Sequence, residues 1–399
     1  MKSFKQYIRP YLSEEVDAQF GKLKHLEHAE DHPFKDGLAG FHRAVDTLNS
    51  VHEALKGGQN DTRITTKYDG APSVVFGHHP QTGKFFVATK SAFNKDPKIN
   101  YSDEDIERNH GHAPGLVEKL KHALKHLPKV APKSGVYQGD MMYSKDDVRD
   151  EGGKYHFTPN TITYSTPKDS EHGKQIAKSK IGMVIHTKYH GSNLEDMHAC
   201  FDVDKDKFKQ HPDVHVVDHE IDHKGLKHDP ENQRFFEHHM EHAQDAMKQG
   251  GEEMLNAVNS HNKHFSTYIN STVRTGETPT HEGFMKHVQE KETKAIDKLK
   301  SEAGKQKNRD KLSTMMAHIK ENKSHFDNAF RLHNHLQKAK DHLIKSLNQN
   351  QEFEHTTAGL PSNPEGFVAI HKGHPTKLVD RAEFSRMNFA NPPENKFNK

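Results

Sequence analysis

The chain contains a single cysteine, Cys200, among its 399 residues. One thiol cannot form an internal disulfide, so the fold does not depend on oxidation, which fits a reducing compartment. No apolar run approaches the roughly 20 residues that a membrane-spanning helix needs, and the first residues lack the apolar stretch of a signal peptide. We therefore expect a soluble protein of the cytoplasm with no membrane partner.

Apolar residues and net charge are also scarce. Hydrophobic residues make up 31% of the chain and charged residues 29%, and the mean hydropathy is −1.01. The 58 basic and 56 acidic residues leave a formal net charge of +2, so a nucleic-acid partner would need a local basic groove. The 36 histidines would add positive charge below about pH 6.5. The length exceeds the roughly 100–200 residues of one domain, so we expect two or three structural units in a monomer.

Hydrophobic periodicity divides the chain into four parts. Helical spacing of apolar residues predicts an N-terminal helical segment at 1–58, which ends at Gly57 and Gly58. Strand-like runs separated by turn residues fill 59–225, helical spacing returns over 226–350, and strand-like runs reappear within 351–399. This order predicts one α+β core interrupted by a large, semi-independent helical insertion. The apolar face of the first helix is Leu38, Phe41, Ala44, Leu48, Val51 and Leu55, and the strand runs are 62–67, 73–77, 84–89, 135–142, 161–165, 181–187, 365–371 and 377–379.

The segment Lys67-Tyr68-Asp69-Gly70 follows one strand-like run and precedes another. A lysine at the end of a strand, followed by a turn with aspartate and glycine, can present its amine to a bound phosphate. The amine becomes nucleophilic only when it has lost its proton. On its own, this short pattern is more typical of a surface turn than of a site.

These four residues resemble motif I of the covalent nucleotidyltransferase superfamily, which comprises ATP-dependent DNA ligases, RNA ligases and mRNA-capping enzymes. The resemblance continues, in the family's order, over residues 60–385. Lys90, after the run at 86–89, matches a basic residue near the ribose. Asp140 follows Gly139 within a run at 136–142 that resembles motif III, and would bind ribose hydroxyls. His186, within the run at 181–187, takes the place of the aromatic residue that stacks on the purine.

The last two motifs lie after the helical block. Glu365-Gly366-Phe367-Val368 resembles motif IV, whose glutamate helps to hold the catalytic metal ion. Lys377-Leu378-Val379 resembles motif V, whose lysine contacts the α-phosphate. Val379 stands where the family often has a second lysine, and Lys372 is the candidate to replace it.

The resemblance implies a nucleotidyltransferase core, an ATP-grasp-like ligase fold of antiparallel-rich sheets with the nucleotide between two sheets. It implies ATP and Mg²⁺ as cofactors, with Lys67 as the nucleophile that forms lysyl-AMP, Lys377 as a fixed catalytic cation and Glu365 as the metal ligand. Asp69 and Gly70 would complete the nucleotide site. About 20 residues follow Lys377, too few for the OB-fold of typical DNA ligases and capping enzymes. We therefore expect an RNA-ligase-like enzyme that joins nucleic-acid ends, with RNA favoured over DNA as its partner.

The overall pattern also resembles uncharacterised proteins of large tailed bacteriophages, which would place the protein in the host cytoplasm. Two alternatives stay open, an ATP-dependent DNA ligase and a non-catalytic nucleotidyltransferase-fold protein that binds nucleic acid. A second E-G-F triplet, Glu282-Gly283-Phe284, follows Thr278-Pro279-Thr280 and reads as a helix start rather than as motif IV.

The histidines invite a metal-site interpretation. Chance clusters are expected among 36 histidines, and the cysteine pairs that would strengthen a zinc assignment are absent. The segment 25–32, which is rich in histidine and acidic residues, is expected to cap the helices at the surface. The two histidine groups with helical or four-residue spacing are His215, His219 and His223, and His238, His239 and His242.

Overall fold

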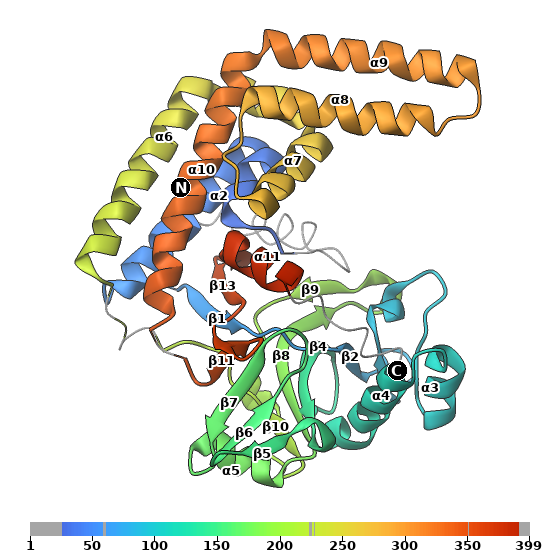
Figure 1. Ribbon diagram of the computed structural model, residues 1–399. Helices are drawn as coiled ribbons and strands as arrows, with labels where there is room; N and C mark the ends of the chain where they lie inside the picture. The colour runs from blue at the N-terminus through green and yellow to red at the C-terminus, as the bar shows by residue number, and fades with distance from the viewer. Residues whose placement is uncertain (1–25, 59–60, 223–225, 227, 350, 391–399) are drawn as a thin grey trace, which may run out of the picture.

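The computed structural model describes residues 26–58, 61–222, 226, 228–349 and 351–390, with the side chains of the last helix described to Ser385. Residues 1–25 of the predicted N-terminal helical segment and His223 of the first histidine group therefore lie outside the described residues. Within them the chain is an α+β protein with a helical part at one end and most of its strands at the other (Figure 1).

The strands of the described residues form three sheets, named A, B and C here. Sheet A has the order β1–β13–β14, sheet B the order β10–β8–β4–β2–β3 with β9 paired to β8, and sheet C the order β12–β11–β7–β6–β5. All pairs are antiparallel except β10 with β8. The strands are β1 (Arg63–Lys67), β2 (Ser73–His78), β3 (Phe85–Ala88), β4 (Val136–Ser144), β5 (Arg149–Glu151), β6 (Lys154–Phe157), β7 (Thr163–Pro167), β8 (Ile181–His190), β9 (His198–Cys200), β10 (Val214–Val216), β11 (Glu354–Thr357), β12 (Leu360–Pro361), β13 (Gly366–His371) and β14 (His374–Leu378).

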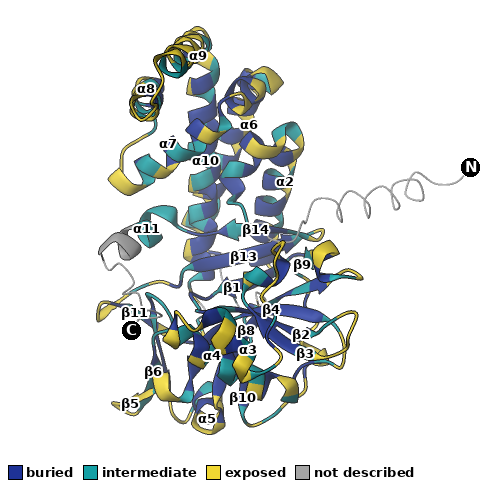
Figure 2. Cartoon of the chain, turned by 90° about the vertical axis from the view of Figure 1, so that its right-hand side faces the viewer, coloured by how far each residue is buried: buried dark blue, intermediate teal, exposed yellow. Residues whose placement is uncertain are grey.

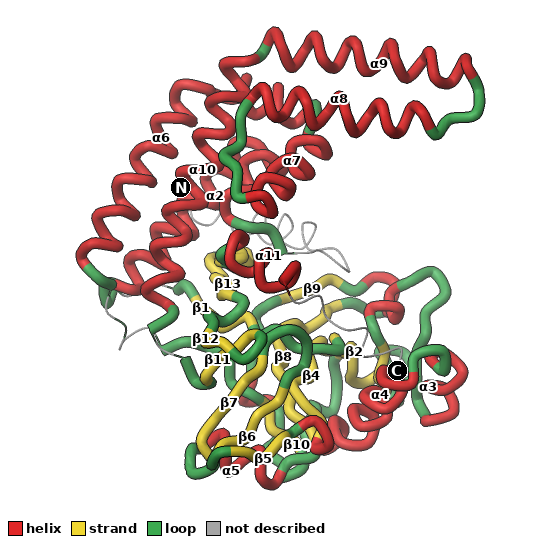
Figure 3. The backbone as a smooth tube through the Cα atoms, viewed as in Figure 1, coloured by secondary structure: helices red, strands yellow, loops and turns green. Residues whose placement is uncertain are grey.

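Ten α-helices lie within the described residues (Figure 3). They are α2 (His32–Leu55), α3 (Asp103–His110), α4 (Pro114–His126), α5 (Glu171–Lys178), α6 (Pro230–Asn259), α7 (Asn262–Thr275), α8 (His281–Asp297), α9 (Glu302–Glu321), α10 (Lys323–Leu347) and α11 (Arg381–Ala390). None of the helices in the described ranges is both long and apolar enough to cross a membrane. Two short 3₁₀ helices, η1 (Ala29–Asp31) and η2 (Lys90–Phe93), precede α2 and follow β3.

The predicted apolar face of α2 is confirmed. Phe41, Ala44, Leu48, Val51 and Leu55 are buried, each with at most 7% of its surface exposed, and Leu38 is half-buried and packs against the same core. The helix ends before Gly57, whose positive φ of 82° is a backbone conformation that glycine adopts without a Cβ penalty.

The helical part and sheet A share one hydrophobic core. Leu48 of α2, Phe236 of α6 and Leu336 of α10 belong to the same buried cluster as Phe367 and Leu378 of sheet A. Figure 2 shows this buried column running from α10 and α2 down into β13 and β14. The helical block is therefore not the semi-independent insertion expected from the sequence, because it completes the core over the N-terminal helix and sheet A.

The described part of the segment 25–32, which begins at Leu26, also differs from the expected surface cap. Glu30 is fully buried and pairs with Lys340 of α10, which is likewise fully buried. The carboxylate of Asp31 pairs with Arg381 at 3.0 Å and with His333 at 3.2 Å. Glu30 and Asp31 thus lie against the core because each finds a cation on α10 or α11, whereas the half-buried Glu27 pairs with Lys35 of α2.

Candidate active site

A cavity of about 290 Å³ lies between sheets A and B. Sheet A contributes Lys67 from the end of β1 and Lys377 from β14, and sheet B contributes Asp140 from β4 and His186 from β8. Alternate side chains of a strand share a face, so Gln138 of β4 reaches the cavity together with Asp140. The other polar side chains that line it are Thr65, Thr66, Tyr68, Ser73, Lys90, Thr187, Tyr189 and His219.

Lys67 is held by Glu365. In the pairing of β1 with β13, Lys67 lies opposite Gly366, which places the preceding Glu365 beside it. The Lys67 ammonium forms an ion pair with the Glu365 carboxylate, whose side chain is only 11% exposed. Burial raises the pKa of Glu365, and the positive charge of Lys67 opposes part of that rise. Glu365 is thus next to the predicted nucleophile but is not itself among the residues that line the cavity.

Lys377 lies across β13 from Lys67. It pairs with Val368 in the β13–β14 ladder, and its side chain is part-buried in the cavity wall. Burial and the nearby Lys67 cation lower the pKa of Lys377, whereas the carboxylates of Glu365 and Glu27 oppose that shift. A cation held at this position by the sheet is suited to contact a phosphate.

The segment that precedes η1 forms part of the same wall. The main-chain N–H of Lys377 donates a hydrogen bond of 2.8 Å to the carbonyl of Glu27, and His28 forms a parallel bridge with Lys377. Leu26 then reaches the cavity. Sequence reasoning missed this contribution, because Leu26 and Glu27 belong to no motif and lie 350 residues before the strand they pair with.

Asp140 and His186 face each other across the β4–β8 pair. The distance between His186 Nε2 and the Asp140 carboxylate is 3.4 Å, and His186 Nδ1 is hydrogen-bonded to Thr187 Oγ1 at 2.8 Å. Burial disfavours the charged form of Asp140, but His186, a hydrogen bond from Ser73 and the charge of Lys67 outweigh it and lower the pKa of Asp140. The acid is therefore held as a carboxylate, able to accept hydrogen bonds.

Asp69 and Gly70 shape the turn after Lys67 rather than line the cavity. The Asp69 carboxylate accepts hydrogen bonds of 2.9 Å from Asn160 Nδ2 and from the main-chain N–H of Thr161. The Asp69 N–H donates to the hydroxyl of Tyr164 at 2.7 Å. A Cβ at Gly70 would lie 2.7 Å from Cβ of Asp140, so only glycine allows this approach. The two residues thus lock the turn onto sheets B and C, and their expected contact with the nucleotide stays a prediction.

The remaining lysines differ in position. Lys90 is exposed at the first residue of η2 and lines the cavity. Lys372, the expected replacement for a second motif V lysine, is 69% exposed and pairs with Asp46 of α2 at 3.4 Å. It does not line the cavity, because it sits in the turn between β13 and β14, whereas Val379 is buried. The expectation for Lys372 is therefore wrong.

The wall of the cavity contains a hydrogen-bonded group that no motif had indicated. Gln138 Nε2 donates to Ser73 Oγ at 2.9 Å, and the Tyr189 hydroxyl donates to Gln138 Oε1 at 2.5 Å. His219 lies on another side of the cavity, and burial lowers its pKa to about 4, with His186 as a further cause. The alternation of β4 could have indicated Gln138, since it precedes Asp140 by two residues. Nothing in the sequence pattern indicates Tyr189, and His219 was noted only as a member of a histidine group, not as a residue of this site.

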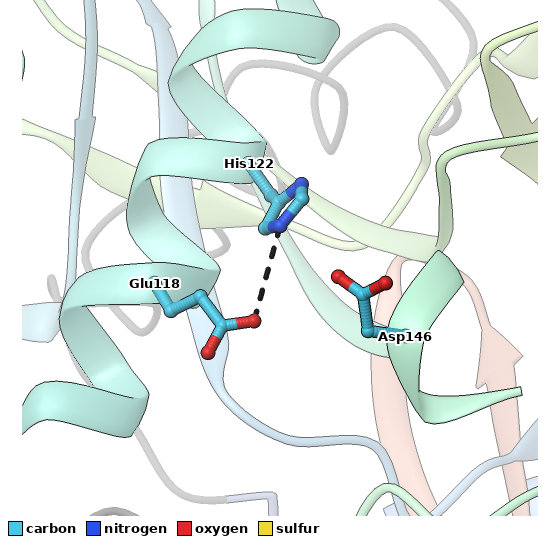
Figure 4. A group of neighbouring side chains, drawn as sticks. All are labelled: Glu118, His122 and Asp146. Carbon is cyan, nitrogen blue, oxygen red and sulfur yellow. Dashed lines mark ion pairs between the residues drawn. The ribbon is translucent and has the colours of Figure 1, made fainter.

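A separate group of potential metal ligands lies outside the cavity. Glu118 and His122 of α4 and Asp146 are the one group with metal-ligand spacing among the described residues (Figure 4). None of the three is buried, and His122 Nε2 lies 3.9 Å from Glu118. Such exposed acidic groups are common without an ion, so we assign no metal here. The predicted histidine groups are not brought together with that spacing in the ranges that the structure describes.

The chain belongs to a protein family of unknown function, DUF6267, which it matches over residues 23–392. No curated protein and no solved structure matches it.

Proposed function

We propose that this protein is an ATP-dependent polynucleotide ligase with a nucleotidyltransferase core, in which Lys67 attacks the α-phosphate of ATP bound between sheets A and B. The observation that carries the proposal is the meeting of Lys67, Lys90, Asp140, His186 and Lys377 at one cavity. These residues were selected from separate stretches of sequence by their resemblance to the family's motifs and by the order of those motifs. A chance series of short motifs would have no reason to converge on a single cavity.

The size and charge of the cavity support a nucleotide. Small-molecule sites usually enclose about 300–1,000 Å³, and this cavity is at the lower end of that range. It would enclose the nucleoside and the α-phosphate, while the outer phosphates extend toward the exposed Lys90. Asp140 would accept hydrogen bonds from the ribose, and His186 would lie against the base. The hydrogen-bonded Gln138, Ser73 and Tyr189 would give this wall a fixed shape.

The chemistry follows from the pairing of Lys67 with Glu365. Attack requires a neutral amine, and the raised pKa of Glu365 makes its carboxylate a better acceptor for the proton that Lys67 must lose. Lys67 Nζ then forms a bond to the α-phosphorus, the bond to the bridging oxygen breaks, and pyrophosphate leaves. Lys377 would stabilise the negative charge that develops on the α-phosphate. The AMP carried by Lys67 would next be passed to a polynucleotide end.

The Glu365 carboxylate would offer Mg²⁺ hard oxygen ligands. Asp380 and Glu383 line a small crevice together with Glu365, but among the described residues these three are not within metal-ligand spacing of one another. Mg²⁺ would supply positive charge to the phosphates during transfer. Glu365 is the residue of this chain that would hold it while contacting Lys67. We propose RNA as the strand substrate, in keeping with the resemblance to RNA ligases.

The direct test is covalent labelling with α-labelled ATP and Mg²⁺. Wild-type protein is expected to form a covalent lysyl-AMP adduct, a phosphoramidate that is stable to alkali and cleaved by acid, and Lys67→Ala is expected to form none. Lys67→Arg is a matched control that keeps the positive charge beside Glu365 but lacks the nucleophile, and it should also remain unlabelled. Labelling of Lys67→Ala would show that another residue is the nucleophile. Wild-type protein that stays unlabelled with ATP, GTP and NAD alike would favour the non-catalytic alternative.

A further inference from the structure

Helices α8 and α9, with residues 298–301 between them, form a protruding helical hairpin, called the arm here. Figure 1 shows the arm at the top of the molecule, reaching out over the same side as α3 and α4 at the bottom. Its base is anchored in the shared core by Phe284 and Val288, which are fully buried. Beyond the base the arm is open to solvent, since Ile319 is the one buried residue of α9.

The tip of the arm concentrates the positive charge of the protein. Residues 291–311 contain eight lysines and arginines and four acidic residues, a net charge of +4. Because the whole chain has a net charge of +2, the rest of the chain has −2. The local basic surface that a nearly neutral protein needs in order to attract a polyanion is therefore present, and it lies on this tip.

Most of these cations are free to bind a ligand. Six of the eight lysines and arginines are exposed, and none of these six pairs with an acidic side chain in the part of the chain that the structure describes. Binding a phosphate would therefore break no existing ion pair. The six are Lys294, Lys298, Lys300, Lys307, Arg309 and Lys311.

The shape of the arm favours a polynucleotide over other anionic partners. The 20 residues of α9 span about 30 Å, close to one turn of a nucleic-acid duplex. A helix that lies on a membrane needs an apolar face as well as a basic one. Here the apolar residues Leu312, Met315 and Met316 already pack against the core, and Leu299 is the one large exposed apolar side chain of the arm.

We propose that the arm binds the sugar-phosphate backbone of the polynucleotide whose ends are joined at the cavity. This proposal rests on the proposed ligase function for the identity of the reaction, and on the charge and exposure of the arm for the contact itself. The contact is electrostatic and independent of base sequence, so it should weaken steeply with salt.

The test compares the full-length wild-type chain with Lys298→Gln/Lys300→Gln/Lys307→Gln. All three positions are exposed, and glutamine keeps the helix propensity of Lys307 in α9 and a polar side chain at Lys298 and Lys300 between the helices, so the fold should be retained. The matched control is Lys133→Gln/Lys174→Gln/Lys178→Gln, which removes three exposed lysines from the opposite end of the molecule. Binding to fluorescent nicked DNA duplex, nicked RNA duplex and single-stranded RNA is measured by anisotropy across a salt series, and lysyl-AMP formation is measured in parallel.

We expect the arm variant to bind at least roughly tenfold more weakly, with a salt slope reduced by about two to three. The control variant should bind as wild type, and all three proteins should form lysyl-AMP equally. Unchanged binding and an unchanged salt slope in the arm variant would overturn the arm proposal and leave the ligase proposal standing. Labelled wild-type protein that binds none of the probes would also overturn the arm proposal, while leaving the formation of lysyl-AMP established. Loss of binding by the arm variant without labelling of wild type would support the arm and overturn the ligase proposal instead.

Discussion

At the scale of single residues, the two glutamates of the E-G-F triplets have different surroundings. Glu365 is largely buried against Lys67, whereas Glu282 is 73% exposed in the first turn of α8, 3.5 Å from Lys323. The same three letters therefore mark a residue beside the cavity in one place and a solvated helix start in the other.

This difference leads to a prediction for adenylylation. Glu365→Ala removes the proton acceptor and the proposed Mg²⁺ ligand, and should slow labelling of Lys67 by roughly 10²–10³. Lys377→Ala should have a similar effect, because it removes a fixed cation from the site of developing charge. Glu282→Ala is the matched control and should label at the wild-type rate. The measurement is the labelling rate at saturating ATP across a Mg²⁺ titration, and an inactive Glu282→Ala beside a fully active Glu365→Ala would refute the assignment of motif IV.

The sequence could predict the site residues that belong to short motifs. Lys67, Lys90, Asp140, His186 and Lys377 were identified in this way, and all of them line the cavity. Residues that reach the cavity from unrelated segments could not be identified. Leu26, Tyr189 and His219 are of this kind, because their position depends on tertiary packing rather than on local pattern.

At the scale of elements, the strand predictions succeeded where buried β-branched or aromatic residues dominate. The runs at 62–67, 73–77 and 181–187 correspond to β1, β2 and β8. The β5–β6 hairpin was missed because Arg149, Asp150 and Glu151 are all exposed and give no apolar signal. Its turn, Gly152-Gly153, has positive φ at both residues, a pattern typical of two-residue hairpins that the sequence did contain.

A buried ion pair joins η1, in the N-terminal segment, to α10. Glu30 and Lys340 are both fully buried, with 2.7 Å between Glu30 Oε1 and Lys340 Nζ. Burial would raise the pKa of Glu30, but Lys340, His28 and Arg381 together lower it to about 2. The same segment then forms the hydrogen bond from Lys377 to Glu27, so the pair holds a wall of the cavity in place.

Removing one partner of this pair should be costly. Lys340→Met leaves the Glu30 carboxylate buried with Arg381 at 3.5 Å as its remaining cation, and should lower the free energy of unfolding by about 3–5 kcal/mol. The double variant Glu30→Leu/Lys340→Met removes both charges and should recover most of that loss. Urea unfolding of the three proteins measures both effects. A single variant as stable as wild type, or a double variant less stable than the single, would contradict the role given to the pair.

At the scale of the whole molecule, sequence reasoning identified the helices but not how they join the sheets. Leu48 and Leu336 lie far apart in the chain and meet in one core with Phe367. Periodicity shows which face of each helix is apolar, but not which other face it meets. Removal of the helical block would expose that core on α2 and sheet A, so the helical part and the cavity form one folding unit.

Pairs of histidines in hydrogen-bonding contact lie where neighbouring elements pack against each other; these contacts are called histidine joints here. His239 of α6 and His335 of α10 are 3.0 Å apart between their Nδ1 atoms, and His261 Nε2 lies 2.9 Å from His318 Nδ1 of α9. Burial, followed by the neighbouring ring, lowers the pKa of His239, His335 and His261 to about 4. Further pairs join α2 to the segment before α6 and α5 to β10: His52 with His228, and His172 with His215.

These histidine pairs predict that the free energy of unfolding decreases at acidic pH. In the folded state His239, His261 and His335 stay neutral down to about pH 4, whereas in the unfolded chain they bind protons below their ordinary pKa near 6.5. The unfolded state therefore takes up more protons as the pH falls from about 6.5 to about 4, and the free energy of unfolding decreases across that window. Each extra proton contributes a slope of about 1.4 kcal/mol per pH unit, so several pairs acting together should give a slope well above that of one group.

Urea unfolding at a series of pH values measures the slope, and His239→Gln/His335→Gln should reduce it because glutamine carries no titrating group. A free energy of unfolding that stays constant between about pH 7 and pH 4.5 would show that the histidine joints do not control stability.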